Sequence, residues 1–144
     1  MKIVRGNLKL NGVTGFSWRI FDNIKCENLH LFDMIIPAVL TQSINVSGDI
    51  LLLQITGNVI GLINRITCNC LTIDYMKLNS DSTSSLTKIL QSRVREMTLG
   101  CDGTLEDFFL LESYDGKGHC KKIVLKLRNI GENKTFDNVE HRGT

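Results

Sequence analysis

The pattern that decides the fold is seen in LHLFDM at residues 29–34, where apolar side chains occupy the first, third and sixth positions. The same spacing starts at Leu8, at Ile50 and at Leu71, so four copies begin at equal intervals along the chain. Alternation of apolar and polar residues is typical of a strand with one buried face. A constant offset between copies indicates an internal repeat.

Two further copies follow at longer intervals. The fifth begins at Met97 and has Asp102 in its sixth position. We place the sixth at Leu125, after a still longer interval, with all three apolar positions filled. The chain therefore reads as about six similar units, of which the last are longer.

A unit of this length holds one short strand and a return segment, and neither can bury its apolar side chains alone. Stacking the units builds a continuous core and a parallel sheet. We therefore expect an α/β solenoid over residues 1–130, with the parallel sheet on its concave side and short helices or turns on its convex side. Residues 131–144 are expected to form a polar C-terminal tail. A parallel β-helix, which needs little or no helix, is the alternative fold.

The return segments predict helices of two sizes. Between residues 80 and 94, Leu86, Ile89, Leu90 and Val94 fall at helical spacing, and residues 105–111 form a second candidate helix. The first units are shorter and leave less room, so we expect only a helical turn or two in residues 17–21 and 59–63.

These features resemble a known family. The strand motif, the lengthened units and the segment SLTKIL at residues 85–90 are similar to leucine-rich repeats, and among these to the ribonuclease-inhibitor-like type found in the tails of NOD-like receptors. The resemblance covers roughly residues 5–130. It implies recognition of a protein or another ligand through the concave sheet.

Composition excludes several classes of function. The formal net charge of +2 supplies little attraction for phosphates, so we expect no nucleic-acid partner. No segment is long and apolar enough to span a bilayer, and the first residues, MKIVRG, lack the apolar stretch of a secretory signal. Five cysteines, an odd number, without such a signal favour reduced thiols and a cytoplasmic location.

Catalytic and metal-binding patterns are weak. His119 and Cys120 are neighbours, but adjacent residues on an extended chain point apart, so a nucleophile pair is disfavoured. Cys68 and Cys70 form half of a metal site at most, because no second pair follows at the required spacing. We expect no enzyme activity, no metal and no cofactor.

The strand pattern also predicts a binding face. The second and fourth positions of each copy point away from the core, which gives an apolar centre edged by polar side chains and by basic residues at both ends. The expected protein-binding residues are His30, Phe32, Leu51, Leu53, Asp74 and Tyr75. Because residues 50–53 are apolar throughout, a slip by one residue would exchange the inward and outward pairs.

Two functions remain open. The first is an interaction module that recognises a protein or peptide through the concave sheet. The second is a structural fragment of a longer repeat protein, whose surfaces contact only further repeats. Polar caps at both ends are needed by a solenoid that stands alone, so the two ends of the core discriminate between these functions.

Overall fold

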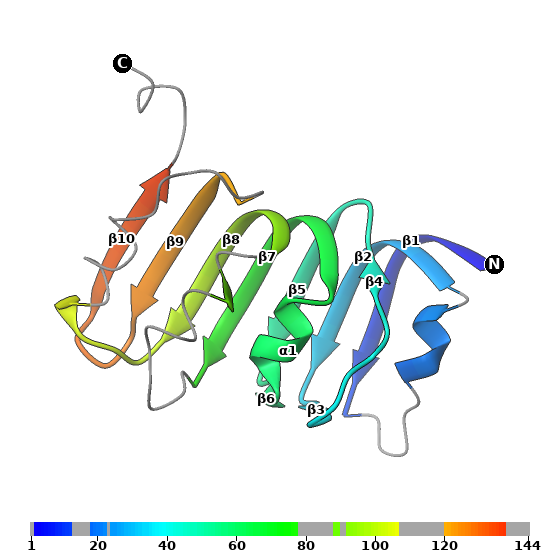
Figure 1. Cartoon of the computed structure of the whole chain (residues 1–144), viewed down its shortest axis with the longest axis horizontal. Helices are drawn as coiled ribbons and strands as arrows, with labels where there is room; N and C mark the ends of the chain where they lie inside the picture. The colour runs from blue at the N-terminus through cyan, green and yellow to red at the C-terminus, as the bar shows by residue number, and fades with distance from the viewer. Residues whose placement is uncertain are drawn as a thin grey trace.

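A computed structural model describes residues 2–12, 18–22, 24–77, 88–89, 92–106 and 120–137, with side chains omitted for residues 2–4 and 137. The described chain consists mostly of strands in a mostly parallel sheet, with few helices (Figure 1). This is the broad α/β arrangement expected from the alternation of strands and return segments.

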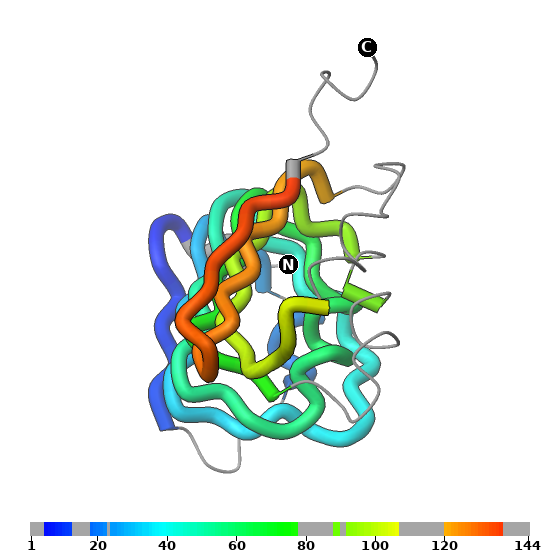
Figure 2. The backbone as a smooth tube through the Cα atoms, turned by 90° about the vertical axis from the view of Figure 1, so that its left-hand side faces the viewer, coloured from blue at the N-terminus to red at the C-terminus, as the bar shows by residue number. Residues whose placement is uncertain are grey.

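The elements follow one another in a regular order. They are β1 (Lys2–Asn11), the 3-10 helix η1 (Trp18–Asp22), β2 (Ile24–Phe32), β3 (Ile35–Ile36), β4 (Ile44–Asn45), β5 (Asp49–Leu53), β6 (Thr56–Gly57), α1 (Val59–Ile63), β7 (Ile66–Met76), β8 (Arg93–Cys101), β9 (Lys122–Leu127) and β10 (Glu132–Asp137). The main sheet has the order β1-β2-β5-β7-β8-β9-β10, with β4 paired to β7, and β3 pairs with β6 in a small second sheet. Figure 2 shows successive turns of the described chain one behind another around a common interior.

The strands pair in the register predicted for the first four copies. Leu8 lies opposite Leu29, Leu29 opposite Ile50, and Ile50 opposite Leu71, all in parallel ladders. The third positions pair in the same way and include Leu31 and Leu52. The constant offset between these copies therefore places like side chains at one height, where they form continuous columns.

The prediction for the last copy was wrong by two residues. Met97 lies opposite Ile123 and Leu99 opposite Leu125, so the sixth strand segment begins at Ile123 and not at Leu125. The interval from Met97 to Ile123 then equals the one from Leu71 to Met97. The sequence was ambiguous because Ile123, Leu125 and Leu127 are all apolar and all buried, so the alternation alone allows either start.

The fifth copy is also complete, contrary to its reading from the sequence. A bulge between Ile73 and Met76 in β7 places Met76 opposite Cys101, which is buried, and leaves Asp102 outside the core. The apolar sixth position is therefore occupied by Cys101. A bulge adds one residue to one strand of a pair, and no spacing rule applied to a single strand detects it.

A left-handed residue follows each of the first three strand segments. Gly12, Asp33 and Gln54 have φ of 58°, 55° and 54° and occupy the same place in successive units. Two ladder bonds run through this turn, from the N–H of Gly12 to the carbonyl of Phe32 and from the N–H of Asp33 to the carbonyl of Leu53. A left-handed conformation is costly for residues other than glycine, so its recurrence shows that stacking of the units enforces the turn.

A second buried column lies three or four residues before the strand segments. Cys26 pairs with Val46, and Cys68 pairs with Val94; all four residues are buried. In the corrected register Cys120 takes the same place before Ile123, and it is buried. Small apolar side chains and thiols thus fill the corner of the core. All five cysteines lie in the described residues, and no disulfide joins them.

The short helical turns were predicted correctly. η1 covers Trp18–Asp22, and α1 covers Val59–Ile63 with four buried side chains. Asn58 caps α1 by accepting a hydrogen bond from the N–H of Gly61 at 3.1 Å, and its amide donates to the carbonyl of Ala38 in the preceding unit. The cap therefore also joins neighbouring units.

The two longer helices predicted from the sequence lie mostly outside the described residues. Val94, expected at the end of a helix, lies instead in β8, because it belongs to the buried corner column. Residues 88–89 and 105–106 are helical, but the rest of both candidate helices lies outside the described residues.

The main sheet continues past residue 130, where we expected a polar tail to begin. β10 pairs antiparallel with β9, and Phe136 in β10 is buried opposite Ile123. Residues 138–144 lie outside the described part of the chain.

None of the helices in the described residues combines the length and the hydropathy that crossing a bilayer requires.

The register of β5 predicts unequal effects of substituting two adjacent leucines. Leu52→Ala removes a fully buried side chain and is expected to cost about 2–5 kcal/mol in free energy of unfolding. Leu51→Ala, on the half-buried outer face, is expected to cost about 1 kcal/mol. Urea unfolding of both variants measures the difference. Equal losses of free energy of unfolding in the two variants would contradict the placement of Leu52 inside the core and Leu51 outside it.

Candidate functional site

The outer face of the main sheet carries the residues expected to bind a partner. In β5, Ile50 and Leu52 are 1% and 0% exposed, whereas Leu51 and Leu53 are half-buried on the opposite face. The one-residue slip considered for this strand is therefore excluded. Leu51 and Leu53 face outward, as predicted.

Four of the expected residues form one block. Phe32 lies opposite Leu53 and His30 opposite Leu51 in the ladder between β2 and β5. Phe32 is 36% exposed, while His30 and the two leucines are half-buried. We call these four residues the outer apolar block. Because strand partners on one face are separated by about 5 Å, the four side chains form a single small surface.

Asp74 and Tyr75 lie beside this block but are held by other partners. Both occupy the bulge near the end of β7, which turns two successive side chains away from the core. Asp74 accepts a hydrogen bond from Arg128 at 2.6 Å, and the hydroxyl of Tyr75 donates to Asp102 at 2.8 Å. The hydrogen bond to Asp102 raises the pKa of Tyr75. These residues form a polar edge.

Gly100 makes the contact between Asp74 and Arg128 possible. It lies in β8, between the strands that lead to these two residues. A Cβ at Gly100 would collide with the carbonyl oxygen of Asp74 and would lie 3.1 Å from Nε of Arg128. The absent side chain therefore lets the arginine reach across β8, and the bulge brings the β7 backbone close to it.

The basic end of the face is arranged differently from the prediction. With the sixth copy starting at Leu125, its outward positions would be Lys126 and Arg128, opposite Thr98 and Gly100 of the fifth copy. In the corrected register Val124 lies opposite Thr98, and Lys126 lies opposite Gly100. Arg128 is instead turned to Asp74.

A polar row borders the block on its other side. Asp49 lies opposite Cys70, Cys70 opposite Glu96, and Glu96 opposite Lys122. The thiol of Cys70 donates to Glu96 at 3.6 Å. Desolvation first, and then the negative charge of Asp49, raise the pKa of Cys70. The thiol therefore stays protonated at neutral pH, which disfavours a nucleophilic role.

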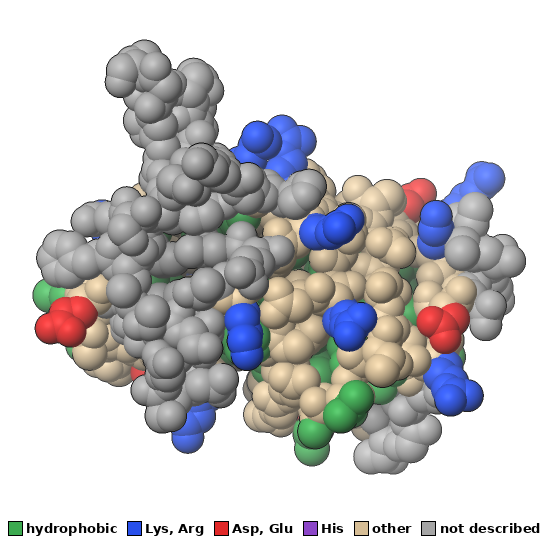
Figure 3. Space-filling model, viewed as in Figure 1, with side chains coloured by type: hydrophobic (Ala, Val, Ile, Leu, Met, Phe, Trp, Pro, Cys, Tyr) green, Lys and Arg blue, Asp and Glu red, His purple; other side chains and the backbone are tan. Residues whose placement is uncertain are grey.

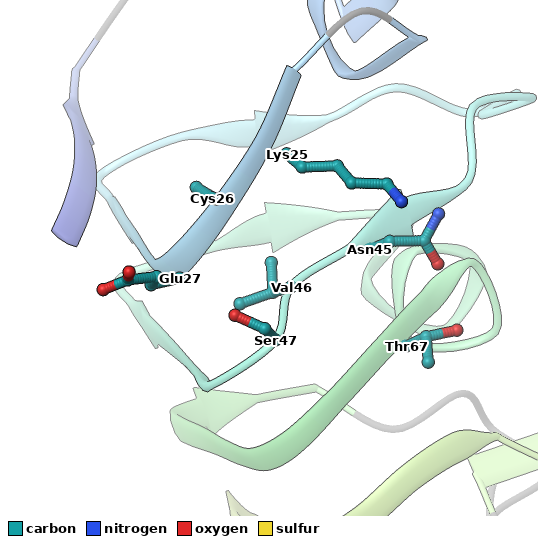
Figure 4. A pocket seen from close by; sticks show the side chains of 7 residues that line it. All are labelled: Lys25, Cys26, Glu27, Asn45, Val46, Ser47 and Thr67. Carbon is teal, nitrogen blue, oxygen red and sulfur yellow. The ribbon is translucent and has the colours of Figure 1, made fainter. Parts of the chain in front are cut away.

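An open pocket of about 380 Å³ lies at the other end of β2 (Figure 4). Its lining residues are Lys25, Cys26, Glu27, Asn45, Val46, Ser47 and Thr67. Figure 4 shows the side chains of Lys25 and Asn45 pointing toward one another across it. Among the lining residues only Cys26 and Val46 are buried, so the polar lining is solvated and rests on the corner column of the core.

Sequence reasoning did not find this pocket, because three segments that are distant in the sequence contribute to it. The available signal was the position of Cys26 and Cys68 three residues before their strand segments, which marks the corner.

The described residues contain no group of three or more histidine, cysteine or carboxylate side chains able to hold a metal ion. Cys68 is buried, whereas Cys70 bonds to Glu96 on the outer face. Cys120 donates a hydrogen bond to the carbonyl of Lys122 at 3.4 Å, and burial raises its pKa to about 11. Its neighbour His119 lies outside the described residues.

The side of the molecule that carries α1 differs from the outer face of the main sheet in the kinds of side chain on its surface (Figure 3). In its described part, lysine and arginine side chains are scattered over a mainly polar surface, and hydrophobic side chains form only small separate patches.

Searches against protein-family models, curated proteins and solved structures found no match.

The buried thiols predict that stability falls in alkaline solution. Burial raises the pKa of Cys68 from 9.0 to about 12. In the unfolded chain this thiol ionises near its ordinary pKa, so its contribution to stability is complete below pH 9 and is lost as the pH rises toward 12. The free energy of unfolding should therefore decrease over this window.

Cys68→Ala is expected to make this decrease shallower, and Thr67→Ala, at the exposed neighbouring position, should leave it unchanged. Urea unfolding at several pH values, from neutral through the window between 9.0 and about 12, measures both slopes. If the free energy of unfolding falls with pH equally steeply in Cys68→Ala and in the unsubstituted chain, the thiol has the same pKa in the folded and unfolded states, and the prediction is wrong.

Proposed function

We propose that the chain is a short leucine-rich-repeat solenoid, of the ribonuclease-inhibitor-like type found in the tails of NOD-like receptors, and that it acts as a protein-interaction module. The outer face of the main sheet, the concave wall in that family, would receive a protein or peptide. The fold proposal is supported by the in-register pairing of Leu8, Leu29, Ile50 and Leu71, and by the short helical elements between strands.

The outer apolar block is the observation that carries the binding proposal. A sheet face open to water is normally lined by polar side chains, yet here Phe32, Leu51 and Leu53 occupy neighbouring outward positions. An apolar centre with a polar rim is the usual composition of a protein interface, and aromatic side chains contribute most to binding at such centres.

The surroundings of the block supply a rim. Asp74 and Tyr75 lie on one side with their partners Arg128 and Asp102, and the row that includes Asp49 lies on another. Because the carboxylates of Asp74 and Asp102 are already hydrogen-bonded, the rim is ordered before a partner arrives. Such order lowers the entropy lost on binding.

Other classes of function are less well supported. The net charge of +2 gives a weak field for nucleic acid. The raised pKa values of Cys70 and Cys120 disfavour thiol catalysis, so we propose a module without enzyme activity, cofactor or membrane partner. Five cysteines that form no disulfide, all within the described residues, support a reducing, cytoplasmic setting.

The second candidate is a structural fragment of a longer repeat protein. It is favoured by the half-buried Leu8 and Leu10 in β1, which leave the core incompletely covered at that end. Further repeats stacked there would cover these side chains.

Selection of peptides from a random library displayed on phage, followed by calorimetry, tests the binding proposal. Phe32→Ala and Leu53→Lys are each expected to lower the affinity for the selected peptides by about tenfold or more, because each substitution removes an apolar side chain from the centre of the interface. Val39→Lys is the matched control, because Val39 is an exposed apolar residue between β3 and β4, outside the main sheet.

Peptides that bind Phe32→Ala and the unsubstituted chain equally would refute a role for the block. Failure to select any peptide that depends on it would favour the structural fragment.

A further inference from the structure

The two edges of the main sheet are built differently. At the C-terminal edge, β10 pairs with β9, and the inward side chains Ile123 and Leu125 are 3% and 0% exposed. At the N-terminal edge, β1 carries Leu8 and Leu10 in the same two columns, yet both are only half-buried.

At the N-terminal edge, the described residues cover the core only in part. Within the described part of the chain, the partly buried hydrophobic residues that pack against the core come from the first unit: Leu8, Leu10, Trp18 and Ile20. Trp18 and Phe21 pack with ring centroids 5.8 Å apart. An incompletely covered edge of this kind is a surface on which another strand gains both hydrogen bonds and apolar contacts.

The backbone of β1 offers a defined set of hydrogen-bonding groups. Gly12 donates its N–H to Phe32 in β2, and N–H directions alternate along a strand. Asn7, Lys9 and Asn11 therefore direct their N–H and carbonyl groups away from β2, and β1 pairs only with β2 among the described strands. An irregularity between Val4 and Asn7, where Gly6 has a φ of 88°, confines the regular edge to residues 7–11.

The opposite edge is closed to strand addition. In β10, Lys134 lies opposite Leu125 and Glu132 opposite Leu127, so charged residues occupy positions that are apolar in the other strands. Inward-pointing charges at an edge strand prevent another strand from extending the sheet. Head-to-tail stacking of copies is therefore disfavoured, because Leu8 and Leu10 would meet Lys134 and Glu132.

We propose that β1 pairs antiparallel with β1 of a second copy of this chain, about a two-fold axis at Leu8. Leu8 then faces Leu8 of the partner copy as a close, non-hydrogen-bonded pair that continues the core. Asn7 lies opposite Lys9 of the partner copy and exchanges both backbone hydrogen bonds with it. A symmetric contact of this kind closes after two copies.

Charge selects this register. Moving the axis to Lys9 would place this lysine opposite itself, and moving it to Asn7 would place Arg5 opposite Lys9. Like charges directly opposite one another are destabilising. With the axis at Leu8, each lysine meets an asparagine. The dimer leaves the outer apolar block uncovered, so it does not depend on the proposed function.

Sedimentation velocity over a wide range of concentrations tests the proposal. The unsubstituted chain is expected to shift from monomer to dimer as concentration rises. Lys9→Pro removes an N–H that faces the free edge and leaves the bonds from β1 to β2 intact, so this variant should remain monomeric. Lys9→Thr, which keeps the backbone donor, should dimerise, and circular dichroism checks that all variants fold.

A charge exchange tests the register and does not depend on tolerance of proline. Asn7→Lys places two lysines opposite each other in every pair and should abolish the dimer. The double variant Asn7→Lys, Lys9→Glu places opposite charges in the same positions and should restore it. A monomeric unsubstituted chain at all concentrations, or a dimer unaffected by both Lys9→Pro and Asn7→Lys, would overturn the proposal.

Discussion

The structure depends on one constraint, the in-register stacking of apolar side chains between parallel strands. A parallel ladder holds equivalent residues at one height, so each leucine of β2 must meet an apolar residue of β1 and of β5. Because the side-chain period is two, a slip of one residue would expose a whole column. Every return segment must therefore bring the chain back to the same height.

This constraint explains features that are unfavourable by themselves. Asp33 and Gln54 adopt a left-handed conformation that glycine alone adopts without strain. Asparagine side chains then join neighbouring units: Asn28 accepts from the N–H of Asp49 at 2.9 Å, and Asn129 bonds both backbone groups of Gly103. Backbone groups left over by the turns are thus satisfied by the adjacent unit.

The proposed binding face combines a regular part of the repeat with an irregular one. Up to β5 the outward side chains include a compact apolar group, since Phe32 and Leu53 are direct ladder partners. At β7 a bulge introduces Asp74 and Tyr75 together, and Gly100 lets Arg128 approach. The polar edge therefore depends on one extra residue in β7 and on one absent side chain in β8, whereas the apolar block needs only the regular register.

The two ends of the core differ for a related reason. Antiparallel β10 places charged residues where a further parallel strand would need apolar ones, whereas β1 keeps leucines in both columns. The proposed contact between two copies uses this difference. The charged residues of β10 make that edge unsuitable for pairing, whereas the leucines of β1 leave the other edge suitable.

Residues 50–53 are apolar throughout, so the structure decided the outward positions of Leu51 and Leu53 by burying Ile50 and Leu52. The sequence by itself determined the repeat, its constant period over the first four copies, the helical turns expected around residues 17–21 and 59–63, and the outward positions of His30 and Phe32. All of these follow from alternation along a single strand or from a constant offset. Tertiary structure alone decided the start of the sixth segment at Ile123, the use of Cys101 in place of Asp102, the pairing of Asp74 with Arg128, the pocket beside Lys25, and the strand at residues 132–137. These depend on which residues of another strand lie opposite. A run such as residues 123–127 satisfies the local pattern in either register, so only the neighbouring strand can select one.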